Sequence, residues 1–263
     1  MRRSLAAAML GAAVLQAPRP TSYSYDFRAA TGDHGQPMTG TVRVNGSRAR
    51  IDVVTRGEGD DGEYLLVSAD GRVVTVVKPH ERTFSVFDAD QFAHLASLGI
   101  GAAGRALTMK VRESSFQTTS LGDGERIVGR PTQRARLVER WRMDVGAMGF
   151  TTPMDESVET EYTFDPTLTL ARNPLLELLS TTAEVLPATD PRYAARADSV
   201  RRSIVHGTPL RTVITERHQD GDTSRTVIEV TRFGAARVDL SELEVPAGYT
   251  RRDNGLSGFR LKL

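Results

Sequence analysis

The chain of 263 residues contains no cysteine. This absence excludes disulfides, thiolate metal sites and a cysteine nucleophile. It also removes the cysteine to which bacterial lipoproteins attach their lipid, so we expect a protein that is not a lipoprotein.

The sequence also lacks an excess of charge of either sign. It has 34 basic and 33 acidic residues, and no basic stripe with interleaved aromatic residues. Nucleic acid is therefore not an expected partner. Beyond the N-terminus no apolar run is long enough to cross a bilayer, so we expect no integral membrane segment once that region is removed.

The N-terminal region has the pattern of a bacterial signal peptide. Arg2 and Arg3 precede an apolar run over residues 5–15, and small residues continue to Ala17. The pattern predicts a signal peptide over residues 1–17 and an exported protein, periplasmic or secreted. The cleavage site is not fixed by the pattern, and an uncleaved anchor is the alternative. The remaining residues, 18–263, are predicted to form a single domain.

Residues 40–88 predict an antiparallel meander. Val42 and Val44 alternate with polar residues, and Asn45-Gly46 and Asp70-Gly71 are strong hairpin signals. Similar alternation predicts further strands over residues 22–28, 109–118, 133–145, 158–164, 210–217, 224–233 and 238–245. The pattern favours a mainly β (α+β) fold with a curved antiparallel sheet.

Helical spacing interrupts this β pattern in three places. Residues 90–107 form the first candidate, and Asn173-Pro174 and Asp190-Pro191 begin two more helices within a helical insert around residues 173–206. Their apolar stripes predict that they lie on the sheet. The glycine-rich segment 121–125 predicts a turn.

Four segments carry a family resemblance: residues 40–52, 64–87, 124–131 and 245–249. On these the chain resembles uncharacterised exported bacterial proteins of the DUF4412 type, which are distantly related to the LolA-like periplasmic lipoprotein carriers. The resemblance implies an unclosed LolA-like half-barrel whose concave face is covered by helices. In the carriers that face takes up acyl chains.

No motif in the sequence predicts a catalytic site, a cofactor or a bound metal. A G-x-G-x-x-G begins at Gly99, but a strand does not precede it and no helix follows, so a flexible helix end is the better interpretation. The acidic segment 58–63 does not match a calcium loop. No two of the five histidines have metal-binding spacing, and Ser257 lacks the nucleophile-elbow pattern.

An apolar face between sheet and helices is the remaining candidate site. Its predicted members are Trp141, Met143, Tyr162, Phe164, Leu178 and Leu179. We expect a non-enzymatic protein that holds a hydrophobic ligand, such as a lipid or a lipoprotein acyl chain, against these residues. An ordinary packed core is the competing interpretation of this face. The alternative function is an envelope protein that binds a protein partner through its sheet edge or outer face.

Overall fold

The computed structural model describes residues 22–32, 37–55, 62–68, 73–88, 107–147, 150–168, 191–217, 219 and 221–252. Within them the chain forms one sheet in the order β12-β6-β5-β4-β3-β2-β1-β11-β10-β9-β8-β7. The strands are β1 (Ser22–Thr31), β2 (Met38–Asn45), β3 (Arg48–Thr55), β4 (Tyr64–Val67), β5 (Val73–Lys78), β6 (Thr83–Asp88), β7 (Leu107–Ile127), β8 (Arg130–Ala147), β9 (Phe150–Asp165), β10 (Thr208–Arg217), β11 (Thr223–Ala235) and β12 (Thr250–Arg251).

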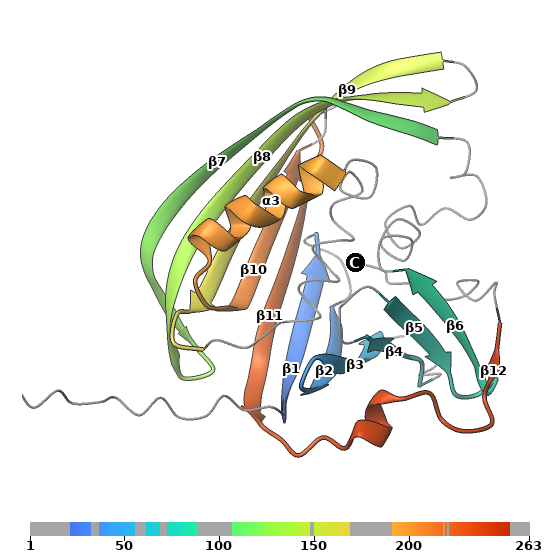
Figure 1. Cartoon of the computed structure of the whole chain (residues 1–263). Helices are drawn as coiled ribbons and strands as arrows, with labels where there is room; N and C mark the ends of the chain where they lie inside the picture. Colours follow the sequence, from blue (N-terminus) through green and yellow to red (C-terminus); the bar gives the residue numbers. More distant parts are fainter. Residues whose placement is uncertain are drawn as a thin grey trace, which may run out of the picture.

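The mainly β fold with a single unclosed sheet is confirmed. Every neighbouring pair in the sheet is antiparallel except β12, which pairs with β6 in parallel. The described sheet ends at β12 on one side and at β7 on the other. Figure 1 shows how strongly the β7–β10 end curves.

The predicted meander is present as β2 to β6. Asn45 pairs with Arg48 across the β2–β3 turn, and Gly46 takes the positive φ of 62° that this turn requires. In β1, Tyr23, Tyr25 and Phe27 are buried on one face, as their alternation predicted.

The predicted turn at residues 121–125 is wrong. β7 continues through this segment to Ile127, and the chain reverses at Val128 and Gly129, which both have positive φ. Irregularities in the β7–β8 register lie between Ser120 and Gly122 and again after Gly124. A strand absorbs such glycines as β-bulges, so glycine content alone did not distinguish a bulge from a turn.

The helix predicted after residue 190 is confirmed as α3 (Pro191–Ile204). It packs against β7, and Figure 1 shows it on the inner side of the curve formed by β7 to β10. The helix predicted from Asn173 lies outside the described residues, as does the helix predicted at residues 90–107 except for Leu107, which begins β7. A set of helices covering the concave face is therefore not confirmed.

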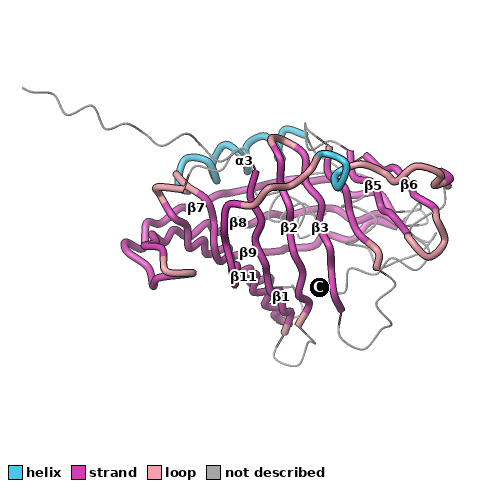
Figure 2. Tube along the Cα trace, turned by 90° about the horizontal axis from the view of Figure 1, so that it is seen from below, coloured by secondary structure: helices cyan, strands magenta, loops and turns pink. Residues whose placement is uncertain are grey.

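The strand predicted at residues 238–245 is wrong. The chain forms a short 3-10 helix, η2 (Leu240–Leu243), which begins at a capping box between Asp239 and Glu242. The C-terminal segment then places Val245 and Tyr249 against Tyr64 on β4 and finally adds β12 to the sheet. Figure 2 shows from below how the sheet spreads from β7 to β6.

The face of the sheet that carries α3 is called the inner face below. The register of the strands places its buried apolar side chains on one continuous surface, which includes Tyr25, Phe27, Val42, Ile51, Leu65, Val76, Leu137, Trp141, Val158, Ile228 and Val230. Burial of this surface is the main source of the fold's stability.

Candidate ligand-binding site

Helix α3 places a tyrosine on the inner face. Tyr193 and Ala197 are buried one helical turn apart, so they form the side of α3 that faces the sheet. Val200 and Ile204 follow at helical spacing and pack against the cluster formed by Ala135, Leu137, Tyr162 and Phe164. The amphipathic spacing of this segment therefore positions the tyrosine over β8.

A buried carboxyl group lies beneath this tyrosine. Glu139 on β8 is only 2% exposed, and its Oε2 accepts a hydrogen bond of 2.5 Å from the Tyr193 hydroxyl. Burial raises the pKa of Glu139, while the Tyr193 hydrogen bond and the charge of Arg201 act in the opposite direction. A buried carboxyl group held in this way is a functional-site candidate.

Aromatic rings surround the Glu139–Tyr193 pair. The Tyr193 ring lies 5.4 Å from that of Phe116 and 6.0 Å from that of Trp141, which meets it edge-on at 74°. The Arg196 guanidinium lies 5.1 Å from the Phe116 ring centre. β7, β8 and α3 thus enclose one acid among three aromatic side chains.

The indole nitrogen of Trp141 is buried and has no hydrogen-bond partner among the described residues. A buried N–H without an acceptor costs free energy, roughly 1 to 3 kcal/mol. Trp141 can therefore donate a hydrogen bond to an oxygen of a bound molecule at little further cost. Together with the apolar inner face, this donor suits an amphipathic ligand better than a purely apolar one.

The structure separates the predicted site residues into two clusters. Trp141 and Met143 belong to the main core cluster, while Tyr162 and Phe164 join the smaller cluster next to α3. All four are buried. Leu178 and Leu179 lie outside the described residues, so the complete set is not brought together here.

Glu139, Tyr193 and Phe116 were missed as site residues. A signal for Glu139 was present, because it stands between Leu137 and Trp141 at an inward position of an alternating strand. A charged residue at such a position is rarely buried without a partner. Its partner on α3 is 54 residues away in sequence, and no local pattern links the two.

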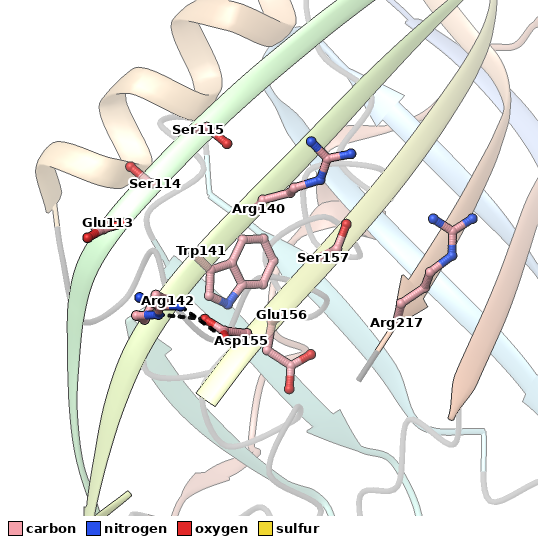
Figure 3. A pocket seen from close by; sticks show the side chains of 10 residues that line it. All are labelled: Glu113, Ser114, Ser115, Arg140, Trp141, Arg142, Asp155, Glu156, Ser157 and Arg217. Atoms are coloured by element: carbon pink, nitrogen blue, oxygen red, sulfur yellow. Dashed lines mark hydrogen bonds and ion pairs between the residues drawn. The ribbon is translucent and has the colours of Figure 1, made fainter. Parts of the chain in front are cut away.

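A pocket of about 420 Å³ is formed by residues of β7, β8 and β9 together with Arg217 at the end of β10. Figure 3 shows the side chains that line it: Glu113, Ser114, Ser115, Arg140, Trp141, Arg142, Asp155, Glu156, Ser157 and Arg217. Among the six predicted residues only Trp141 lines this pocket. Nine of its ten lining residues are polar or charged, in contrast to the residues of the apolar inner face.

Side chains able to hold a metal ion are not gathered in the described ranges. Those ranges contain no group of three or more His, Asp or Glu side chains able to hold a metal ion. His80 and His206 lie in different parts of the structure, and His34, His94 and His218 are outside the described residues. In the same ranges no helix has the length and apolar character needed to span a membrane.

The comparisons with known proteins give a low-scoring structural neighbour and no sequence match. No protein-family model matches the sequence, so the relation to the DUF4412 type stays a prediction. No curated protein matches it either. A LolA superfamily protein from Nitrosomonas europaea is a structural neighbour, with 11% identity and a TM-score of 0.37 over 86% of this chain and 90% of that chain. At this TM-score the likeness is one of general outline.

Proposed function

We propose that this protein is an exported, non-enzymatic binder of a hydrophobic or amphipathic ligand, such as a lipid acyl chain, held between the inner face and α3. The continuity of the apolar inner face supports the proposal. Its side chains form one cluster that extends across the sheet from β8 to β5, and the described helix α3 packs on the β7 end of this face.

The polar groups near α3 indicate how the ligand would be oriented. Trp141 offers an N–H for which the described residues provide no acceptor, and the Glu139–Tyr193 pair supplies a carboxyl group in an apolar setting. An acyl chain would lie along the apolar surface, and its carbonyl or carboxyl oxygen would accept the indole hydrogen bond. Burial of the chain supplies the driving force, about 25 cal/mol per Å² of apolar surface.

Trp141 is the single tryptophan of the chain, so its fluorescence reports on this site alone. The protein, stripped of lipid by detergent, is titrated with a brominated fatty acid and, as the matched control, with the same fatty acid without bromine. We expect bromine to quench Trp141 while the control does not. Native mass spectrometry should show the corresponding adduct. Equal fluorescence in both titrations, with no adduct, would reject the proposal.

Two variants locate the ligand on one face. Phe116→Ser removes an aromatic side chain of the inner face beside Tyr193, and Val54→Ser changes an apolar side chain that is 42% exposed on the other face. We expect the first variant to weaken binding about tenfold and the second to leave it unchanged. The reverse order would place the ligand on the outer face and contradict the proposal.

A second function, binding of a protein partner by strand addition, is favoured by the edge strand β7. Residues 114–122 of this strand contain no charged side chain, although edge strands commonly carry charges that block pairing. The variant Thr119→Lys places a charge on this edge at an exposed position. If β7 pairs with another strand, this variant abolishes self-association or partner capture in light-scattering and cross-linking experiments and leaves fatty-acid binding intact.

A further inference from the structure

The outer face of the sheet carries a row of four polar residues in direct register. Ser115 on β7 pairs with Arg140 on β8, Arg140 pairs with Ser157 on β9, and Ser157 pairs with Arg217 on β10. Residues directly opposite one another project to the same face. Arg140 follows the inward-facing Glu139, so the row lies on the side opposite α3.

Arg140 differs from the nearby arginines Arg136 and Arg142 of β8 in the residue of β9 that it pairs with. Arg142 faces Asp155 and bonds to it at 2.8 Å, and Arg136 faces Glu161 at 3.6 Å. Arg140 instead faces a serine. Arg136 and Arg142 are therefore each placed opposite a carboxylate, and Arg140 is not.

The side-chain contacts of Arg140 also show that it lacks a carboxylate partner among the described residues. Among the described residues it forms no ion pair, and its guanidinium makes one long hydrogen bond of 3.5 Å to Gln117. Within the described part of the chain, Arg217 has a single ion pair, at 3.7 Å with Glu159, and Arg136 approaches that carboxylate more closely at 3.1 Å. The row thus carries positive charge that the described residues neutralise only in part.

Space for a ligand exists at this row. All four residues line the pocket of about 420 Å³. Figure 3 shows the guanidinium groups of Arg140 and Arg217 extending in the same direction on either side of Ser157. Neighbouring strands are about 4.8 Å apart, so the two arginine backbones, two strands apart, are separated by roughly 10 Å. Two long side chains can close on one small anion across that distance.

We propose that this row is a binding site for a tetrahedral oxyanion of the phosphate class. Each guanidinium offers paired N–H donors that match two oxygens of a phosphate, and the serine hydroxyls supply further donors between them. The acidic residues of the pocket, Glu113, Asp155 and Glu156, belong to the rows of Arg142 and Trp141. The anion therefore lies at the Arg140–Arg217 end. The four side chains of the row point to the other face from the proposed acyl-chain site, although Trp141 of that site also borders the pocket. The anion proposal does not rest on acyl-chain binding.

Calorimetric titration of the full chain with inorganic phosphate tests the site. Arg140→Gln and Arg217→Gln should each weaken binding about tenfold or more, as expected for loss of a charge-assisted hydrogen-bonding partner. Ser157→Ala keeps the charge and should weaken binding severalfold. The matched control is Arg237→Gln, which removes the same charge from a side chain that is 95% exposed, and it should bind as the wild type does.

Two results would overturn the assignment. The first is the absence of binding both to inorganic phosphate and to vesicles that contain phosphatidic acid. The second is an equal loss of phosphate affinity in Arg237→Gln and Arg140→Gln. It would show that binding depends only on the net charge of the protein and would reject a site at the row. Circular dichroism of each variant confirms that a loss of binding is not a loss of folding.

The phosphate could belong to a lipid headgroup or be free in solution, and a second experiment separates these sources. Sedimentation with phosphatidylcholine vesicles containing phosphatidic acid is compared with pure phosphatidylcholine vesicles and with inorganic phosphate. Binding to the phosphatidic acid vesicles that Arg140→Gln abolishes assigns the site to a headgroup. Binding of inorganic phosphate alone assigns it to a soluble ion. Both results support the oxyanion site.

Discussion

The hydroxyl of Tyr193 donates a hydrogen bond of 2.5 Å to the carboxyl group of Glu139, and both residues are buried. This bond joins α3 to β8, and the side chains around it are mostly apolar. A buried polar pair of this kind is sensitive to the loss of either partner, because the remaining group then lacks a hydrogen bond that water would otherwise supply. The pair also fixes which residue of α3 lies over β8.

Removal of the tyrosine hydroxyl should loosen this attachment. We expect Tyr193→Phe to lower the free energy of unfolding by about 1 to 3 kcal/mol, since the Glu139 carboxyl group would stay buried without its donor. The measurement is urea denaturation followed by circular dichroism. Tyr249→Phe is the control, because the described residues give its hydroxyl no hydrogen bond, and it should change stability by less than about 0.5 kcal/mol. Equal effects of the two variants would contradict a structural role for this bond.

The raised pKa of Glu139 makes stability depend on pH in a defined direction. The folded protein retains this proton at pH values where the unfolded chain has lost it, so the contribution of Glu139 is fully present below about pH 4.3 and decreases as the pH rises through the higher folded pKa. Glu139→Gln cannot ionise and keeps an acceptor for Tyr193.

We therefore expect Glu139→Gln to gain stability relative to the wild type as the pH rises from 4 to 7. The gain is about 1.4 kcal/mol for each pH unit until the raised pKa is passed. Urea denaturation of both proteins at several pH values measures it. Stability curves that remain parallel over this range would show that the folded and unfolded pKa values of Glu139 are equal.

Asp165 at the end of β9 should show the opposite dependence. Its side chain is fully buried, and burial alone would raise its pKa, but hydrogen bonds from Thr167 and from Arg130 outweigh burial and hold the pKa below its ordinary value. The stabilising contribution is fully present above about pH 3.9 and is lost as the pH falls through the lower folded pKa.

Asp165→Asn should therefore destabilise the protein by about 1.5 to 3 kcal/mol at pH 7, since Arg130 loses its charged partner. The difference from the wild type should shrink as the pH is lowered toward 3. Urea denaturation of both proteins at pH 7, 5 and 3 measures the destabilisation and its decrease with pH. A difference that grows on acidification would show that the folded pKa of Asp165 is raised rather than lowered.

Gly207, between α3 and β10, is packed against backbone. A Cβ atom placed there would lie 2.0 Å from the Asp165 carbonyl oxygen, and backbone cannot move aside as a flexible side chain can. We expect Gly207→Ala to cost about 3 kcal/mol or more. Gly234→Ala is the matched control, because its Cβ would meet no atom within 4 Å, and it should be nearly neutral. Thermal unfolding of the two variants provides the comparison, and similar melting temperatures would refute the tight contact.

Local patterns predicted most of the strands and the described helix. The alternation of Tyr23, Tyr25 and Phe27 identified β1 and its buried face, and the Asn45-Gly46 turn identified the β2–β3 hairpin. These features depend on neighbouring residues, so they can be read from a short stretch of chain. The two errors, at residues 121–125 and 238–245, occurred where glycines or alternating residues are compatible with more than one backbone path.

The site could be predicted only in part. Trp141 was identified because a tryptophan in an alternating strand has a strong tendency to be buried. Its association with Tyr193 was not predictable, because α3 is about fifty residues away and its docking position depends on packing against β7 and β8. The serine and arginine row on the outer face was likewise invisible, since Arg140 and Arg217 are related only through strand register.

The sequence by itself therefore determined the mainly β character of this protein, the positions of its hairpins and the amphipathic spacing of α3, because each is set by short-range periodicity and turn chemistry. Only the tertiary structure decided the order of the strands, the pairing of Tyr193 with Glu139, and the placing of Arg140 opposite a serine instead of a carboxylate. These contacts join residues that are far apart in the chain. They depend on register and helix docking, which the packing of the whole sheet selects and which no local pattern encodes.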